Sequence, residues 1–388
     1  MSLPIRSQLS HVSLFTATLV LSLSHPLPLL STAPVILDTL VRTPMSSDSP
    51  TVNVSEAGRD RAQASPQEMV QRRFQKGLQQ YRNNQFQEAL LTFQQVLTLQ
   101  TKLGDMVGKA ETLHQIGAVY DRLGEYPQAL RFFEQAFAVR QEVGDKAGIG
   151  RTLNSIGGVY YQQGEYAQAL RFFEQVLAVR KQVGDSLGEG RTLSNIGLVY
   201  ENLGQYPRAL EFYQQALEIF QAIANRTGEA ATLNNIGIVH NQLGQYPQAL
   251  KFYQQALVIR REIGDRGGVG TTLHNIGFVY NQQSQYSQAL TFYQQALAVR
   301  TEVGDRSGIA TTLNNIGLIY DKQGEHSPAL EFLQQALVIF RELGDKAGEG
   351  NTLDSIGTVY KSLGQYPQAL ESYQQALAIL REVGNRTV

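Results

Sequence analysis

The stretch DSLGEGRTLSNIGLVYENLGQYPRALEFYQQALEIFQAIA, residues 185–224, decides the fold, because residues 77 to 377 repeat its pattern every 40 residues. The repeat runs through eight units without an insertion or a deletion. Each unit is marked by a glycine and, twelve residues later, by an Ala-Leu pair. The marker glycines are Gly77, Gly117, Gly157, Gly197, Gly237, Gly277, Gly317 and Gly357. Self-similarity at a fixed period of this length predicts a solenoid, which favours binding over catalysis because stacked units form an extended concave surface.

Each unit predicts two antiparallel helices. Asp185 is a good N-cap for the first helix, because its carboxylate can accept hydrogen bonds from the free N–H groups of the first turn. Gly204 suits the left-handed position that ends this helix, and a second helix begins near Pro207. The apolar stripe of the first helix is Leu193, Ile196, Gly197 and Tyr200, and that of the second is Ala209, Leu210, Tyr213, Ala216, Leu217 and Phe220. The short connection makes the two helices neighbours.

The marker glycine lies in the middle of the first helix, where it costs about 1 kcal/mol relative to alanine. All eight units accept this cost, which predicts a close approach of the two helices. We expect the alanine column from Ala89 to Ala369 to form the opposing surface. Tyrosines such as Tyr120 are expected to fill the adjacent gap.

The composition of the 388-residue chain allows an ordered fold and indicates no catalytic chemistry. Apolar residues make up 42% and charged residues 17%, and the net charge of −1 predicts no general attraction to nucleic acid or to anionic membranes. The absence of cysteine excludes disulfides, thiolate nucleophiles and cysteine-ligated zinc. His114 and His274 share a column but lie four units apart, too far to share a metal. We therefore predict no enzyme, no metal and no cofactor.

The first 66 residues do not share the 40-residue pattern. Residues 12–23 are mostly apolar, and Ser31-Thr32-Ala33 offers small residues for cleavage, so residues 1–33 predict a signal peptide. Residues 34–66 predict a disordered linker and residues 67–388 the repeat array. The chain is then expected to be exported, to the periplasm or cell surface of a bacterium, with no transmembrane segment in the mature chain. The alternative is a disordered leader or a wrong start codon, which would leave the protein in the cytoplasm.

The unit resembles the tetratricopeptide repeat. The residues that carry the resemblance read Leu-x-x-Ile-Gly-x-x-Tyr and then Gly-x-Tyr-x-x-Ala-Leu-x-x-(Phe/Tyr)-x-x-Ala-Leu. The 40-residue length is similar to the long-helix subtype of spindle-orientation adaptors, kinesin light chains and cyanobacterial scaffold proteins. The resemblance implies an all-α fold, a right-handed superhelical solenoid of eight helix-turn-helix units. It implies the ligand far less, because the family binds many unrelated partners.

The resemblance also implies that the first helix of each unit lines a concave groove. Two asparagine columns before the marker glycine are then candidate partner-binding residues: Asn195, Asn235, Asn275 and Asn315 in one, and Asn154, Asn234 and Asn314 in the other. Each amide has donors and acceptors for an extended peptide of any sequence. Arg151 and Arg191 match basic clamp positions of the family and could take a carboxylate. The alternative is that duplication copied solvated asparagines that bind nothing.

These features predict a non-enzymatic interaction scaffold that binds an extended peptide or a partner helix in the groove. The first alternative is a sensor or regulatory arm whose effector domain lies elsewhere, since related arrays are often fused to an effector. The second is self-association through the last repeat, because the family's extra capping helix does not follow residues 385–388. The sequence does not name the partner.

Overall fold

The computed structural model describes residues 65–386. The predicted signal peptide, residues 1–33, and all but the end of the predicted linker lie outside the described residues, so both stay predictions. The described residues form sixteen α-helices and no strand. In chain order these are α1 (Pro66–Arg82), α2 (Phe86–Leu103), α3 (Met106–Arg122), α4 (Tyr126–Val143), α5 (Lys146–Gln162), α6 (Tyr166–Val183), α7 (Ser186–Asn202), α8 (Tyr206–Ala222), α9 (Arg226–Gln242), α10 (Tyr246–Glu262), α11 (Arg266–Gln282), α12 (Tyr286–Val303), α13 (Arg306–Lys322), α14 (His326–Leu343), α15 (Lys346–Ser362) and α16 (Tyr366–Arg386).

The helix ends follow the predicted signals. The Asp185 carboxylate, at the start of α7, accepts a hydrogen bond of 2.9 Å from the backbone N–H of Gly188. An Asp or Asn caps each of the remaining odd-numbered helices from α3 to α15 in the same way. Gly204 adopts the left-handed conformation with φ +68° between α7 and α8. Within residues 65–386, three non-glycine residues adopt the same conformation, namely Asn84, Ala224 and Ser284, with φ between 53° and 59°.

The marker glycines make room for a ring of the following helix. A methyl group on Gly197 would lie 2.8 Å from the Tyr213 ring, closer than real side chains pack. The same approach recurs in all eight units, at 2.6 to 2.9 Å, with Phe, Tyr or, once, Leu as the neighbour. The alanine column belongs to the opposing surface as expected, since the backbone oxygens of Ala329 and Ala369 would lie 3.1 and 3.2 Å from a methyl group on Gly317 and Gly357. Alanines such as Ala209 are fully buried, but the side chain four residues later lies against the glycine.

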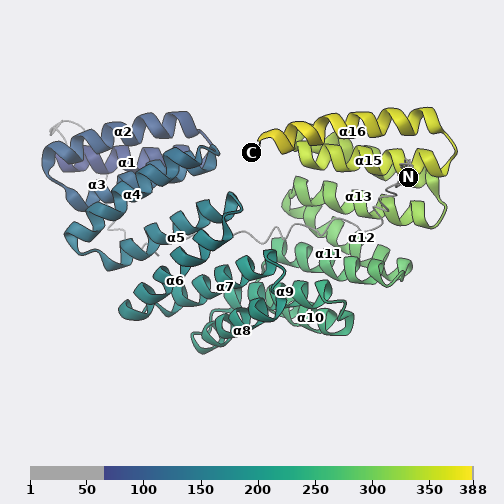
Figure 1. Cartoon of the computed structure of the whole chain (residues 1–388), viewed down its shortest axis with the longest axis horizontal. Helices are drawn as coiled ribbons and strands as arrows, with labels where there is room; N and C mark the ends of the chain where they lie inside the picture. The colour runs from purple at the N-terminus through teal and green to yellow at the C-terminus, as the bar shows by residue number, and fades with distance from the viewer. Residues whose placement is uncertain (1–64, 387–388) are drawn as a thin grey trace, which may run out of the picture. The chain divides into compact units, whose positions relative to one another are not determined.

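Helices pack in chain order, each against the next, so the predicted all-α solenoid is confirmed (Figure 1). In addition, α3 contacts α5, and each odd helix from α7 to α13 contacts the next odd helix. We call the surface formed by the odd helices, on the side where they meet, the inner face. None of the helices in residues 65–386 is both long and apolar enough to cross a lipid bilayer.

The joints between units use one position in two ways. Arg140, Arg260 and Arg300 are buried, and each donates to a backbone carbonyl and to a threonine hydroxyl of the next odd helix. Phe220 and Phe340 occupy the same position in two other units, where their rings pack against a glycine of the next odd helix. One column thus holds a buried, hydrogen-bonded arginine in some units and a packed phenylalanine in others.

The left-handed residues generate a stability prediction. A non-glycine residue pays about 1 kcal/mol or more in this conformation, so Ala224→Gly and Ser284→Gly should each raise the free energy of unfolding by about 1 kcal/mol. Ala298→Gly, at an exposed position inside α12, is the control and should lower it by about the same amount. Urea titration followed by circular dichroism measures all three. A loss of stability in Ala224→Gly would contradict the assignment.

Candidate functional site

Five of the seven predicted asparagines form hydrogen bonds between successive odd helices. Asn195 Nδ2 donates to Asn154 Oδ1 at 3.2 Å, and Asn275 Nδ2 donates to Asn234 Oδ1 at the same distance. Asn315 Nδ2 lies 3.2 Å from the ring nitrogen Nε2 of His274. Each pair is 41 residues apart, one repeat plus one residue. The asparagine columns therefore tie α5 to α7, α9 to α11 and α11 to α13.

This use divides the predicted partner-binding residues into two groups. Asn154, Asn195 and Asn234 are at most 5% exposed, so their side chains serve the packing of one odd helix on the next. Asn235, Asn275, Asn314 and Asn315 are half-buried and present part of their side chains on the inner face. The half-buried group comprises the asparagines that a bound partner could reach without displacing a helix. Whether any of them binds a partner stays a prediction.

A second row of hydrogen bonds runs two helical turns further along the same helices. Gln162 Nε2 donates to Asp121 Oδ1 at 3.2 Å and Asn202 Nδ2 donates to the Tyr161 hydroxyl at 2.9 Å. The row continues with Gln242 Nε2 donating to Glu201 Oε1 at 3.3 Å and Lys322 Nζ donating to Asn281 Oδ1 at 3.5 Å. The sequence analysis missed this row. The sequence signal for this row is a pair of polar residues 41 positions apart, each seven positions after a residue of the asparagine columns.

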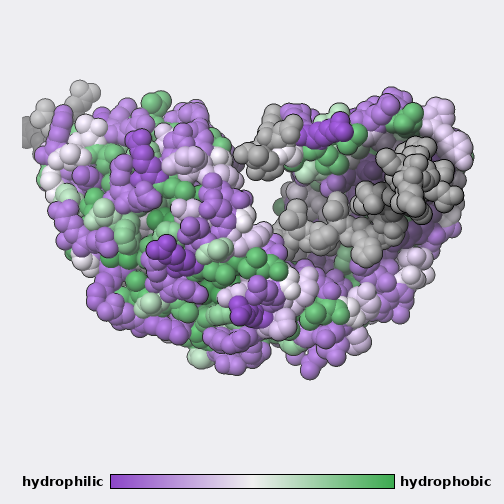
Figure 2. Space-filling view, viewed as in Figure 1, coloured by the Kyte–Doolittle hydropathy of each residue, from purple (hydrophilic) through white to green (hydrophobic). Residues whose placement is uncertain are grey.

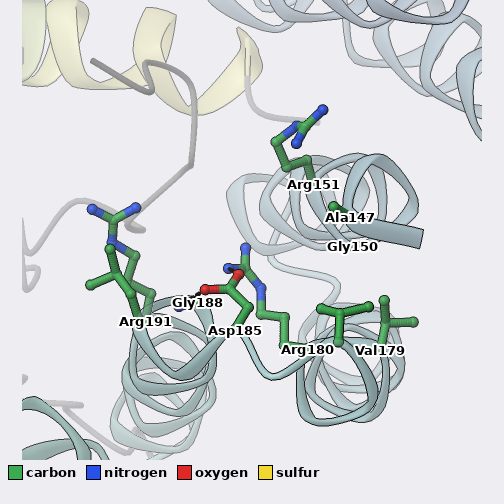
Figure 3. A pocket seen from close by; sticks show the side chains of 10 residues that line it. Ala147, Gly150, Arg151, Val179, Arg180, Asp185, Gly188 and Arg191 are labelled. Atoms are coloured by element: carbon green, nitrogen blue, oxygen red, sulfur yellow. Dashed lines mark hydrogen bonds and ion pairs between the residues drawn. The ribbon is translucent and has the colours of Figure 1, made fainter. Parts of the chain in front are cut away.

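Arg151 and Arg191 lie on either side of a cavity of about 150 Å³ at the joint between α5, α6 and α7 (Figure 3). The aliphatic lining comes from Val179, Val183 and Leu187. The charged lining residues are Arg151, Arg180, Arg191 and Asp185, three cations and one anion. The structure therefore brings together the two arginines that the sequence selected.

Arg180 and Asp185 lie between the two predicted arginines in Figure 3. Arg180 Nη1 donates to Asp185 Oδ2 at 2.8 Å, and the arginine is only 4% exposed. Asp185 Oδ1 accepts from the N–H of Gly188, so the carboxylate is fixed from both sides. A cationic cavity with one internal counter-charge can accept a further anionic group, because the net charge of its lining stays positive.

Arg151 is also placed by a carboxylate on the preceding odd helix. Glu111 Oε2 lies 2.6 Å from Arg140 Nη2 and 3.7 Å from Arg151 Nη2. Burial alone would raise the pKa of Glu111, but its interactions with His114 and Arg140, the hydrogen bond from Gln115 and the Arg151 charge outweigh that effect and hold the pKa below its usual value. Glu111 therefore stays ionised and places a negative charge beside Arg151.

The buried histidines serve packing. Burial, with the Arg300 charge beside it, lowers the pKa of His274 to about 3, so the ring is neutral at physiological pH. His274 Nδ1 lies 3.2 Å from the Thr312 hydroxyl on the next odd helix. His114 makes the equivalent contact with Thr152 at 3.4 Å. Within residues 65–386 no group of three or more His, Asp or Glu side chains is arranged to hold a metal ion.

Asp121, in the second row, generates a pH prediction. Burial raises its pKa to about 6, above the value of about 3.9 in an unfolded chain, so ionised Asp121 destabilises the fold at neutral pH. The destabilisation develops as the pH rises from about 4 to about 6. Asp121→Asn should therefore raise the free energy of unfolding at pH 7 by on the order of 1–2 kcal/mol, and the gain should vanish below about pH 4.

Urea titrations at pH 7 and in acid measure this effect. Glu134→Gln, an exposed carboxylate on α4, is the control and should change stability little at either pH. A gain for Asp121→Asn that is the same in acid would contradict the prediction.

Three solved structures share the fold at low sequence identity. One is the aspartyl phosphate phosphatase F of Bacillus subtilis, with a TM-score of 0.60, 16% identity and coverage of 73% of this chain and 74% of that one. The second is the apo form of the quorum sensor NprR of B. thuringiensis, with a TM-score of 0.59, 15% identity and coverage of 80% of this chain and 87% of that one. The third is the Rap conjugation gene regulator of the plasmid pLS20 in complex with the Phr* peptide, with a TM-score of 0.56, 14% identity and coverage of 83% of this chain and 97% of that one.

No curated protein matches the sequence significantly. The family model described as tetratricopeptide repeat matches the chain seven times in overlapping windows, from residues 74–142 to residues 308–382. Eight helix pairs with one shared pattern account for this series. Since the matches together cover most of the chain, the protein belongs to the tetratricopeptide repeat family.

Proposed function

We propose that the protein is a non-catalytic interaction module that holds an extended peptide segment of a partner along its inner face. The observation that carries the proposal is the cationic cavity at the joint of α5, α6 and α7, bordered by Arg151 and Arg191. A cavity of about 150 Å³ is too small for a folded element and large enough for a carboxylate or a short side chain. The module would therefore anchor an acidic group of the peptide there.

The proposed ligand group is a carboxylate, either the C-terminus of a peptide or an acidic side chain. Arginine suits this role because its planar guanidinium can donate two parallel hydrogen bonds to one carboxylate. Arg151 is about one-third exposed, so its guanidinium can take a new partner without unfolding the helix. Val179, Val183 and Leu187 line one side of the cavity with aliphatic groups, and charged hydrogen bonds are stronger beside apolar groups than in open water.

The rest of the peptide would lie across the odd helices towards α9, α11 and α13. Half-buried Asn235, Asn275 and Asn315 follow in that direction, one in each helix. Their amides can pair with peptide backbone groups, which gives affinity that depends little on the peptide's sequence. Figure 2 shows hydrophilic and hydrophobic residues interspersed on the visible face.

A sensor or regulatory arm is the second candidate. It is supported by the fold likeness to a quorum sensor and to a gene regulator solved with its peptide. The aspartyl phosphate phosphatase shows that this fold also occurs in an enzyme. The two candidates share the peptide site and differ in whether peptide binding changes the affinity for a second protein. Capture of a second protein with and without the peptide separates them.

Export is a separate proposal, supported by the apolar run at residues 12–23 and the small residues before Pro34. It predicts that the mature protein begins at Pro34, because cleavage would follow Ala33. Intact-mass spectrometry of the protein from its native cells measures this. A mass equal to that of the full chain would contradict export by cleavage.

The peptide site predicts a dependence on a free carboxylate. The probe is a pooled library of fluorescent peptides with free C-termini, beside the same library amidated at the C-terminus and one enriched in Asp and Glu. The R151A/R191A double variant should weaken binding of the selected peptides about tenfold or more, since a hydrogen bond to a charged group contributes about 1.5–3 kcal/mol.

Arg171→Ala, on the exposed side of α6, is the matched control and should leave affinity unchanged. Fluorescence anisotropy measures each dissociation constant. Selection of neutral amidated peptides, with affinity unchanged in the double variant, would contradict the site. The first and third libraries distinguish a terminal carboxylate from an acidic side chain.

A further inference from the structure

The two ends of the repeat array are built differently. Four columns are buried in all the later units, where they hold Thr, Leu, Ile and Val (Ile in α13). The same four columns hold exposed polar residues in α1. These polar residues are Arg72, Arg73, Lys76 and Gln79. In α7 the same columns hold Thr192, Leu193, Ile196 and Val199, each at most 2% exposed. The outer side of α1 is thus suited to water, as in the capping units of other repeat proteins.

The last unit keeps the apolar residues of the interior units. Tyr366, Leu370 and Leu377 of α16 are 68%, 58% and 50% exposed. Their counterparts in all seven preceding units are buried or half-buried, because the next unit packs on them. Three large side chains on one helix face are therefore exposed at positions where the same fold otherwise covers them. A surface of this kind marks an interaction site.

We propose that this face of α16 binds the same face of a second copy of the chain, with α16 antiparallel to its partner across a two-fold axis. The proposal rests on the spacing of four exposed residues: Tyr366, Leu370, Leu377 and Arg381. Their separations of four, seven and four residues place them on one stripe of the helix. This dimer proposal does not depend on the proposed peptide site.

The stripe is complementary to itself. Leu370 and Leu377 are centred on the midpoint between residues 373 and 374, and Tyr366 and Arg381 are centred on the same point. One antiparallel register therefore places each Leu370 against Leu377 of the second copy and each Tyr366 against its Arg381. The first contact is apolar, and the second can form a cation–π pair. The two Arg381 side chains lie about 22 Å or more apart at opposite ends, so like charges do not meet.

Head-to-tail stacking fits the surfaces poorly. It would press the apolar stripe of α16 against Arg72, Arg73 and Lys76 of the next copy, which would bury three cations without anions. An isologous pair avoids this burial and closes after two copies. The partner is thus a second copy of the same face rather than the opposite end of the array.

Sedimentation velocity of the full chain, over about a hundredfold range of concentration, tests whether the dimer forms. The dimer fraction should rise with concentration, and L370E or L377E should each weaken dimerisation about tenfold or more. L91E is the matched control, because Leu91 is a 62% exposed leucine on α2, and it should leave dimerisation unchanged. A monomer at every concentration, or a dimer unaffected by L370E and L377E, would overturn the proposal.

Disulfide trapping tests the register, because the natural chain has no cysteine. A mixture of the L370C and L377C variants should form a disulfide-linked heterodimer under mild oxidation. Each variant alone should not, because equivalent positions lie about 10 Å apart along the helices, beyond the Cα separation of about 4.4–6.8 Å that a disulfide spans. Efficient disulfide linkage of two L370C chains, with no L370C–L377C heterodimer in the mixture, would overturn the antiparallel register. Circular dichroism confirms that each variant is folded.

Discussion

The structure depends on the close approach of a side chain to a helical glycine in every unit, an aromatic ring in seven units and Leu333 in the other. Gly197 lies under the Tyr213 ring, and equivalent pairs repeat from Gly77 to Gly357. Because the same contact fixes the distance between the two helices of each unit, all eight pairs have nearly the same internal geometry. Equivalent columns then meet in the same way at each junction. The recurring hydrogen bonds between residues 41 positions apart follow from this regularity.

Periodicity and helix-end chemistry were enough to predict the helices from the sequence. The 3.6-residue stripes, the Asp caps and the left-handed glycines are local signals, and local geometry obeys them. The side chain closest to the marker glycine was not predicted, because Ala209 and Tyr213 lie on the same stripe, one turn apart. Only the rotation of the second helix about its axis decides which of them meets Gly197, and the pattern within one helix does not specify that rotation.

The candidate site shows the same limit. The sequence selected Arg151 and Arg191 through the family resemblance, and the structure places both on one cavity. It did not reveal that Asn154 and Asn195 bond to each other, because such pairing depends on how two odd helices are offset. Columns that are identical in every unit mainly serve the stack. The column of Arg151 and Arg191 instead varies along the chain, with Glu111, Ala231 and Thr271 in other units, and such variation gives one joint a chemistry of its own.

The central claim is that the joint of α5, α6 and α7 binds the acidic group of a peptide on the inner face. Photo-crosslinking tests it most directly, with a selected peptide that carries a photoreactive residue next to its acidic group. Mass spectrometry then locates the modified residues. The account predicts modification in the first half of α5 and of α7, around Arg151 and Arg191. Modification confined to even-numbered helices, or to α16, would contradict it.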